Sequence, residues 1–153
     1  MKISERERES NKAKRMQIII HTDGGAIGNP GPAGIGVVIE MDGKVKTYAE
    51  GIGNTTNNVA EYKAVLFALK KARLLAGKKI QEADIHLYLD SELVGNQMTG
   101  NYKIKDPDLQ TLFVEYWNMH LDLPPITFHL VPREQNTHAD KLVKSVIASN
   151  KLL

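Results

Sequence analysis

The chain has 153 residues, of which 42% are hydrophobic and 25% charged, a balance typical of one soluble globular domain. It has no cysteine, which excludes disulfides, thiolate metal sites and cysteine nucleophiles. No apolar stretch approaches the roughly 20 residues of a membrane span, and no signal-peptide segment follows the basic start, so we expect a cytoplasmic protein without membrane contact.

The net charge of +2 is unevenly distributed along the chain. Residues 1–16 carry six basic and three acidic residues, whereas the rest of the chain carries 14 basic and 15 acidic residues. We therefore expect residues 1–16 to form a basic, disordered arm in solvent, with loose attraction to phosphate as the alternative. Residues 17–153 are expected to form the folded domain.

Hydrophobic periodicity divides residues 17–153 into strands and helices. Short apolar or alternating runs indicate strands, and Asp42-Gly43 between two of them is a hairpin turn signal. Longer runs with an apolar stripe at helical spacing indicate helices. In chain order, the predicted elements are strands 17–22, 34–41 and 44–52, helix 54–77, strand 84–90, helices 91–100 and 106–121, strand 126–131 and helix 136–150.

This order is typical of an α/β fold. It predicts a five-stranded mixed sheet whose first three strands are antiparallel, with helices packed on both faces. Strands joined through a helix are usually parallel neighbours, so we expect the strands that end at Asp23 and Asp90 to lie side by side. The carboxyl edge of such an open sheet is where ligands bind.

Four acidic residues fall at strand ends or on the inner faces of predicted helices. Asp23 and Asp90 each follow a strand. Glu61 and Asp140 share the apolar faces of the first and last predicted helices. Each acid alone has an ordinary explanation as a turn residue or as a carboxylate favoured by a helix dipole. Together they would repel one another unless cations lay between them, and all-oxygen ligation suits Mg²⁺ or Mn²⁺. The four acids therefore indicate a two-metal site of the kind that cleaves phosphodiesters.

Four motifs contain these acids: TDGGAIGNPGPAG, TTNNVAEYKAV, LYLDSELV and VPREQNTHADKLV. In this order, from about residue 17 to 148, they resemble the motifs of the type 1 ribonuclease H family. The resemblance implies a ribonuclease H-like fold and a metal-dependent endonuclease that hydrolyses the RNA strand of RNA–DNA hybrids, leaving 3′-hydroxyl and 5′-phosphate ends. It implies a monomer with no obligate protein partner. It also implies two Mg²⁺ ions, with Mn²⁺ as a substitute, held by the catalytic acids Asp23, Glu61, Asp90 and Asp140.

The resemblance further implies a set of substrate contacts around the first two motifs. Glycine lets the backbone approach a ribose closely, and amide side chains both donate and accept hydrogen bonds. For the asparagines at the start of helix 54–77, helix capping is an equally good explanation from spacing alone. The implied substrate-binding residues are Gly24, Gly25, Asn29, Thr56, Asn57 and Asn58.

The sequence departs from the family pattern at three places. Glu92 stands where many bacterial members have a substrate-contacting glutamine. The segment TGNYKIKDPD is too short for the basic, tryptophan-rich protrusion of some members, so we expect modest, salt-sensitive affinity. The loop VPREQN lacks the mobile histidine of many members, and Glu134 is the candidate replacement. The strand histidines, His21, His86 and His129, are expected to be packed or hydrogen-bonded rather than catalytic.

Three alternatives to a hybrid-cleaving enzyme stay open. The first is a nucleic-acid-binding module without catalysis, against which the four intact acids count. The second is a two-metal nuclease of the same fold that cuts DNA or double-stranded RNA, against which the Thr-Asn-Asn and GNPG elements count. The third is a domain once joined to a larger enzyme, such as a reverse transcriptase or a phosphatase, of which the chain shows no remnant.

Overall fold

The computed structural model describes residues 2–151, with the side chains of all but 11–14 and 149–151. The strands are β1 (Met16–Ala26), β2 (Gly31–Met41), β3 (Lys44–Thr55), β4 (Ala83–Leu89) and β5 (Ile126–Leu130). The helices are α1 (Glu5–Lys14), α2 (Asn57–Ala76), α3 (Glu92–Met98), α4 (Pro107–His120) and α5 (Thr137–Lys151), with 3-10 turns η1 (Gly77–Glu82) and η2 (Arg133–Gln135). None of the helices in this part of the chain is both long and apolar enough to cross a membrane.

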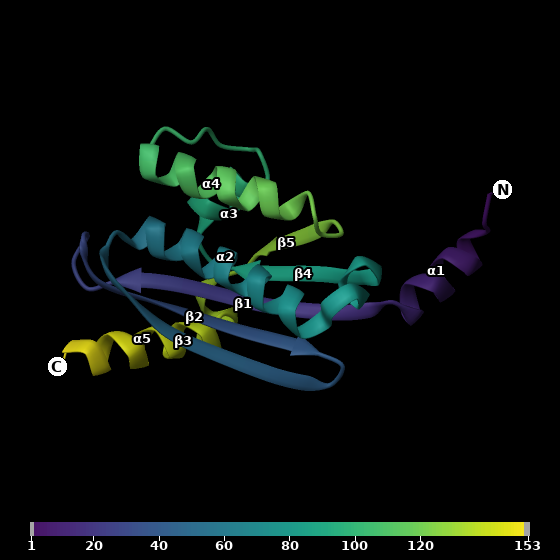
Figure 1. Ribbon diagram of the computed structural model, residues 1–153, viewed down its shortest axis with the longest axis horizontal. Coiled ribbons are helices and arrows are strands. Elements are labelled where there is room, and N and C mark those ends of the chain that lie inside the picture. Colours follow the sequence, from purple (N-terminus) through teal and green to yellow (C-terminus); the bar gives the residue numbers. More distant parts are fainter. Residues whose placement is uncertain (1, 152–153) are drawn as a thin grey trace.

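The strands form one mixed sheet in the order β3-β2-β1-β4-β5, which confirms the predicted fold class. β1, β2 and β3 are antiparallel, joined in part by a hairpin turn in which Asp42 and Gly43 both have positive φ. β4 pairs parallel to β1, and β5 parallel to β4, because helical segments connect them. Figure 1 shows α2, α3 and α4 on one side of the sheet and α5 on the other.

The core lies mainly between the sheet and α2. Side chains alternate along β4, so that Ile85, Leu87 and Leu89 are buried on the α2 side. Tyr62 and Leu69 of α2 are fully buried against them in one cluster. This packing fixes the carboxyl ends of β1 and β4 beside each other, as the sequence predicts.

Glycine composition around residues 21–34 predicts a turn, but most of this stretch is strand. β1 and β2 pair as far as Ala26 and Ala33, which leaves only a short connection between them. Two glycines in or near this stretch allow helices to lie close to the sheet. A Cβ on Gly24 would lie 2.4 Å from the Ala60 carbonyl carbon of α2, and one on Gly36 would lie 2.3 Å from a carbonyl oxygen of α5. Close packing explains these two glycines, whereas Gly28, with a φ of 79°, serves the chain reversal between the strands.

The predicted disordered arm is different in the structure, where residues 5–14 form helix α1. Its residues are mostly strong helix formers. The Ser4 backbone N–H donates to Glu7 Oε2 at 2.8 Å, and the Glu7 N–H donates to Ser4 Oγ at 3.2 Å, which is a reciprocal capping box. Figure 1 shows α1 projecting away from the sheet, at the opposite end of β1 from the carboxyl edge.

Candidate functional site

Three carboxylates meet at the carboxyl edge of the sheet. Asp23 lies in the last part of β1, Asp90 directly follows β4, and Glu61 lies in the second turn of α2. One oxygen from each lies within 4.8 Å of the other two. Asp23 and Glu61 are only 7% and 8% exposed, so this is a desolvated acid cluster rather than a solvated acidic surface.

Glycine at position 24 brings Glu61 to this cluster. A Cβ there would lie 2.4–2.6 Å from backbone atoms of Ala60 and Glu61, a separation that real side chains do not reach. Because Gly24 has no side chain, α2 can lie directly over the end of β1. The Glu61 carboxylate then reaches the Asp23 side chain.

Asp23, Glu61 and Asp90 form no ion pair with a Lys, Arg or His side chain in the described part of the chain. Burial, followed by the nearby charges of Asp90 and Asp140, raises the pKa of Asp23 to about 7. Burial also raises the pKa of Glu61 well above its usual range, with smaller contributions from the charges of Asp23 and Asp90. Glu61 Oε2 is buried and has no hydrogen-bond partner in the described part of the chain. A group that carries positive charge and accepts oxygen ligands fits this environment.

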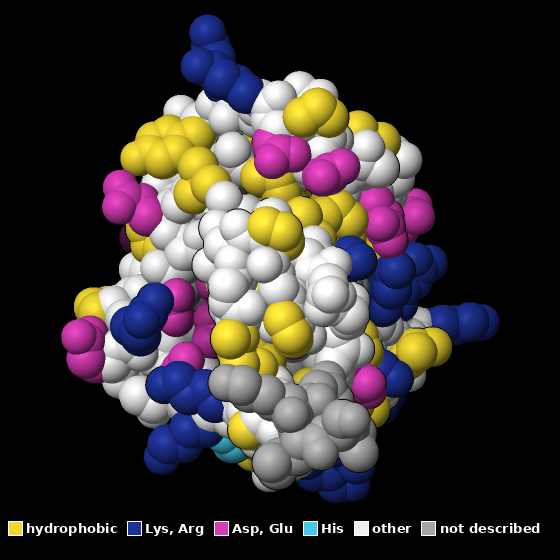
Figure 2. All heavy atoms as spheres, turned by 90° about the vertical axis from the view of Figure 1, so that its left-hand side faces the viewer, with side chains coloured by type: hydrophobic (Ala, Val, Ile, Leu, Met, Phe, Trp, Pro, Cys, Tyr) yellow, Lys and Arg dark blue, Asp and Glu magenta, His cyan; other side chains and the backbone are white. Residues whose placement is uncertain are grey.

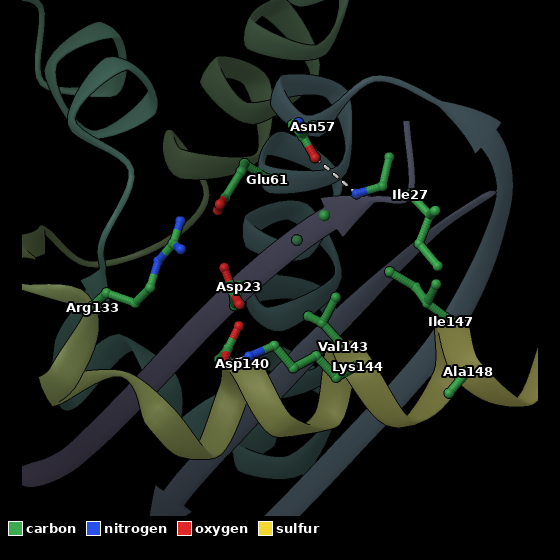
Figure 3. Close-up of a pocket in the computed structure, with 13 residues that line it drawn as sticks. Asp23, Ile27, Asn57, Glu61, Arg133, Asp140, Val143, Lys144, Ile147 and Ala148 are labelled. Carbon is green, nitrogen blue, oxygen red and sulfur yellow. Dashed lines mark hydrogen bonds and ion pairs between the residues drawn. The ribbon is translucent and has the colours of Figure 1, made fainter. Parts of the chain in front are cut away.

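Asp140 is the fourth predicted acid, and it reaches the same cavity from α5. It forms an ion pair with Lys144 one turn later, with 2.8 Å between Nζ and Oδ2. It faces Asp23 across the cavity (Figure 3) but does not belong to the set of three within 4.8 Å. The structure therefore brings all four predicted acids to one place, with three in a tight cluster and Asp140 beside it.

Asn136 holds Asp90 in place, a connection that the sequence reading did not assign. Its side chain is 1% exposed, and its Nδ2 donates to the Thr22 carbonyl at 2.8 Å and to Asp90 Oδ2 at 3.1 Å. It thereby links the residue before Asp23 with the carboxylate after β4. The only signal in the sequence was an asparagine placed at the predicted start of the last helix.

A cavity of about 590 Å³ opens over the acids. Figure 2, which looks onto this end of the molecule, shows acidic side chains set into a hollow with Lys and Arg side chains beside it. Arg133 and Lys144 are the basic residues that line the cavity, and Figure 3 shows Arg133 directed toward the acids. Glu134, the predicted auxiliary residue, does not line it. Within the motif VPREQN, it is therefore Arg133, and not the predicted Glu134, that reaches the cavity.

The predicted substrate-binding residues divide into two groups. Gly24, Gly25 and Asn57 line the cavity. Thr56 is the N-cap of α2, because its hydroxyl accepts from the Val59 N–H at 3.2 Å. Asn29 and Asn58 also lie outside the cavity lining.

Asparagines tie the loop after β1 to the start of α2. Asn57 Oδ1 accepts from the Ala26 N–H at 2.8 Å, and the Asn57 N–H donates to Asn29 Oδ1 at 3.0 Å. These bonds fix the rim of the cavity next to Asp23. Thr56, rather than Asn57 or Asn58, is the N-cap of α2, so the capping interpretation of the two asparagines is wrong. Substrate contact by the group stays a prediction.

Known proteins share this arrangement. Residues 21–146 match the family described as reverse transcriptase-like. LC11-RNase H1, isolated from compost by a metagenomic approach, has a solved structure that is 44% identical, with a TM-score of 0.83 over 88% of this chain and 97% of that chain. The chain belongs to the ribonuclease H family. LC11-RNase H1 has also been solved in complex with an RNA/DNA hybrid, with a TM-score of 0.82 and 43% identity over 87% of this chain and 98% of that chain.

Longer ribonuclease H relatives contain the domain as a part. Ribonuclease HI of Halobacterium salinarum is 38% identical over 129 residues, which are 82% of this chain and 61% of that protein. A bifunctional protein of Mycobacterium tuberculosis is 38% identical over 135 residues, which are 86% of this chain and 36% of that protein. The chain therefore spans little more than a third of the length of its mycobacterial relative.

Proposed function

We propose that this ribonuclease H family member is a metal-dependent endonuclease that hydrolyses the RNA strand of RNA–DNA hybrids, leaving 3′-hydroxyl and 5′-phosphate ends. The observation that carries the proposal is the buried cluster of Asp23, Glu61 and Asp90, whose oxygens lie within 4.8 Å of one another. The complex of LC11-RNase H1 with an RNA/DNA hybrid supports the same substrate class for this chain.

The site residues fit divalent metal ions. The cluster is desolvated, and among the described residues it forms no ion pair and leaves Glu61 Oε2 without a hydrogen-bond partner. Its donors are all carboxylate oxygens, which suit Mg²⁺, with Mn²⁺ as a substitute. Two such ions, when bound, supply an activated water nucleophile and stabilise the leaving oxygen. The residues proposed to hold them are Asp23, Glu61, Asp90 and Asp140.

The chain's own cations and amides are proposed to position the substrate. Arg133 points into the cavity, and its planar guanidinium suits two-point contact with a phosphate. We therefore assign phosphate contact to Arg133 in preference to the auxiliary role predicted for Glu134. Lys144 neutralises Asp140 across 2.8 Å, and Asn136 fixes the orientation of the Asp90 carboxylate.

The cavity rim is proposed to recognise the ribose. Gly24, Gly25 and Asn57 line the cavity next to Asp23, so backbone groups and an amide can approach a 2′-hydroxyl, which distinguishes RNA from DNA. Asn29 supports Asn57 because its Oδ1 accepts from the Asn57 backbone N–H. Asn58 is exposed beside Asn57 and is proposed to contact the second strand.

One experiment tests the activity. Labelled RNA–DNA hybrid, double-stranded RNA and double-stranded DNA are incubated with the protein in Mg²⁺, Mn²⁺ or EDTA, with Asp23→Asn in parallel. We expect cleavage of the hybrid alone, dependent on metal and lost in Asp23→Asn. Absence of metal-dependent hybrid cleavage would contradict the proposal, and equal cleavage of double-stranded RNA would contradict its substrate class. A cytoplasmic location and a monomeric state stay predictions.

A further inference from the structure

Asp140 differs from the other proposed metal ligands because a cation already lies beside it. Lys144 Nζ is 2.8 Å from Asp140 Oδ2, one helical turn later on α5. Within the part of the chain that the structure describes, no ion pair involves the other three acids, Asp23, Glu61 and Asp90. The four carboxylates are therefore electrostatically unequal before any metal ion binds.

The position of Asp140 sets it apart as well. It lines the same cavity as Asp23 and Glu61, but it does not join the set of carboxylates whose oxygens lie within 4.8 Å of one another. Figure 3 shows the Asp140 carboxylate facing Asp23, with the ammonium end of Lys144 beside it. A metal ion held by Asp140 and Asp23 would therefore lie close to the Lys144 ammonium.

The Lys144 side chain can leave Asp140 at little cost. Lys144 is 74% exposed and Asp140 is 24% exposed. Ion pairs with this exposure stabilise a protein only weakly, because water screens the charges and the long side chain loses conformational freedom. An acid four residues before a lysine is nevertheless the favourable orientation on a helix. The pair therefore forms in the metal-free protein and yields to a divalent ion.

The ammonium group opposes a divalent ion at Asp140 in two ways. It occupies Oδ2, one of the two oxygens that could bind the ion, and its positive charge repels the ion. We propose that Lys144 is an internal competitor that weakens metal binding at Asp140, so that the two metal positions of this centre differ in affinity. The inference rests on the proposed function, because it concerns the metal ions of that function.

Unequal positions predict that the centre fills in two steps. The cluster of Asp23, Glu61 and Asp90 offers three carboxylates to a first ion. The position at Asp140 fills second, at a metal concentration that Lys144 raises. Lys144 thereby widens the range of metal concentration in which the protein holds one ion, and it sets the concentration that a two-ion reaction needs.

Titration of the full chain with Mn²⁺ tests this role, with calorimetry to measure affinity and electron paramagnetic resonance to count free ions. Lys144→Met removes the charge but keeps an unbranched side chain. It should tighten the weaker step by about twofold to fivefold, the range that loss of an exposed ion pair covers, and leave the stronger step nearly unchanged. Lys144→Arg keeps the charge and should keep the original affinity. Loss of a merely structural lysine would not tighten metal binding.

Two further variants separate contact with Asp140 from a general effect of charge. Lys141→Met is the matched control, because Lys141 is an exposed lysine of α5 that does not line the cavity. It should change the weaker step less than Lys144→Met does. Asp140→Asn should weaken or abolish that step. Adding Lys144→Met to Asp140→Asn should then give no tightening, because the two residues act as a pair.

The inference is overturned if Lys144→Met neither tightens a second Mn²⁺ step nor reveals one. Equal tightening in Lys141→Met, or tightening that persists in full beside Asp140→Asn, would also overturn it. Absence of Mn²⁺ binding in every variant would instead contradict the metal centre of the proposed function. Cleavage of hybrids does not enter these titrations, so failure of the nuclease activity and failure of this inference are distinguishable.

Discussion

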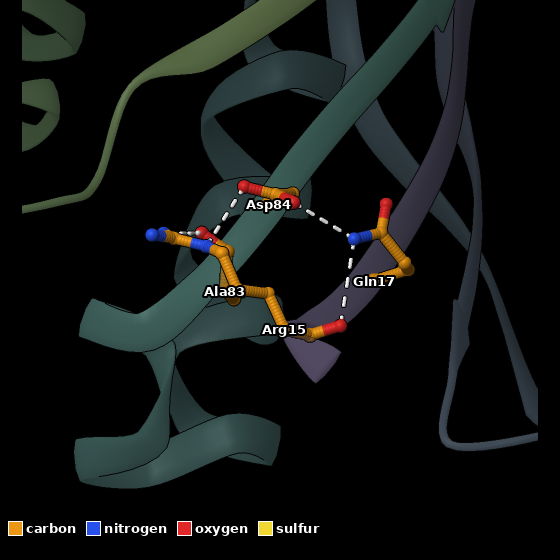
Figure 4. A network of polar contacts seen from close by, with 4 residues as sticks. All are labelled: Arg15, Gln17, Ala83 and Asp84. Atoms are coloured by element: carbon orange, nitrogen blue, oxygen red, sulfur yellow. Dashed lines mark hydrogen bonds and ion pairs between the residues drawn. The ribbon is translucent and has the colours of Figure 1, made fainter. Parts of the chain in front are cut away.

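The acidic residues at the two ends of β1 lie in opposite environments. At the amino end, Asp84 of the neighbouring strand is fully paired (Figure 4). Arg15 Nε lies 3.0 Å from its Oδ1, and Gln17 Nε2 donates to its Oδ2 at 2.8 Å. Arg15 also donates to the Ala83 carbonyl at 3.0 Å. The fold thus satisfies a partly exposed carboxylate with two partners, Arg15 and Gln17, one at each oxygen.

At the carboxyl end, Asp23 and Glu61 are buried and form no ion pair with any residue that the structure describes. Asp23 and Glu61 are the more deeply buried, and burial raises the pKa of both. The contrast shows that acidic residues alone do not mark a functional site. A carboxylate kept away from water and from cations destabilises the empty protein, and such a cost is typical of positions selected for ligand binding.

Substitution of one aspartate at each end of β1 should give the clearest test of whether the two ends differ in function. Asp23→Asn removes a proposed metal ligand. Because a bound metal ion contributes several kcal/mol of transition-state stabilisation, hybrid cleavage should fall by about a thousandfold or more. The same substitution removes a buried charge and should leave the melting temperature of the metal-free protein unchanged or higher. Cleavage assays and thermal melts on the same samples measure both effects.

Asp84→Asn is the matched control at the other end of β1. It should lower the melting temperature slightly and leave the cleavage rate unchanged, because Asp84 lies at the far end of the strand from the cavity. Equal loss of activity in both variants would show that the difference between the ends has no functional meaning.

Adjacent glycines at the carboxyl end offer a second test. Gly24→Ala places a Cβ 2.4 Å from the backbone of α2, so α2 must shift, and unfolding free energy should fall by about 1–3 kcal/mol or more. Hybrid cleavage should fall with it, because Glu61 moves away from Asp23. Gly25→Ala is the control, since its Cβ would meet the Val143 side chain at 3.6 Å and Asn57 Oδ1 at 3.9 Å, which are ordinary contacts. Chemical denaturation of both variants measures the difference, and similar stabilities would refute the packing role of Gly24.

The stability of the metal-free protein should depend on pH through the acid cluster. The pKa of Asp23 rises from 3.8 in its ordinary state to about 7 in the fold, so the folded protein binds more protons than the unfolded chain within this window. Its contribution to stability is present below the lower value and is lost as the pH rises through the higher one. The melting temperature should therefore fall by several degrees between about pH 4 and about pH 7.

Divalent metal and substitution separate this effect from other titrations. Mn²⁺ should raise the melting temperature most at the higher pH, where the carboxylates are charged. Asp23→Asn should reduce the pH dependence, and Asp23→Asn combined with Glu61→Gln should flatten it, because burial raises the pKa of both acids. Asp84→Asn should leave it unchanged. A slope that persists in the double variant would assign the pH dependence to groups outside the cluster.

Chain order and periodicity predicted much of this site because its acids lie at element boundaries. Asp23 and Asp90 follow β1 and β4, and a parallel pair of strands must bring their carboxyl ends together. The apolar stripes of α2 and α5 in turn directed Glu61 and Asp140 inward. These inferences needed only the period of each element and its order in the chain.

The parts that escaped prediction depend on side-chain contacts across long sequence separations. Asn136 bonds a carbonyl 114 residues earlier, and no local pattern marks such a contact. His86 Nδ1 and His129 Nε2 lie 2.9 Å apart in a hydrogen bond between the two rings, a pairing that depends on strand register as well as on ring orientation. Helix α1 was missed because its high charge suggested disorder, whereas its Ser4–Glu7 capping box favours a helix.

Arg133 and Glu134 are neighbours in the chain, but only Arg133 lines the cavity. Substitutions of the two residues therefore make a matched pair. Arg133→Ala should lower hybrid cleavage by about tenfold to a hundredfold, because a charge-assisted contact to phosphate is worth about 1.5–3 kcal/mol. Glu134→Ala should change it by less than about threefold, because Glu134 does not line the cavity. Rates under single-turnover conditions measure both. If Glu134→Ala lowered hybrid cleavage more than Arg133→Ala, the auxiliary role would return to Glu134 and the phosphate contact assigned to Arg133 would be wrong.

The smallest expected effect lies at the paired end of β1. Arg15→Ala breaks the ion pair with Asp84, whose two side chains are 42% and 24% exposed, so unfolding free energy should fall by no more than about 1 kcal/mol. The loss should shrink as salt is added, because exposed charges are screened. Gln17 still donates to Asp84 in this variant, so Arg15→Ala combined with Gln17→Ala should cost more than Arg15→Ala alone. Denaturation at low and high salt measures these differences, and hybrid cleavage should stay constant throughout. If the loss instead approached that of Gly24→Ala, the paired end would support the fold as strongly as the close packing of α2 on β1 does.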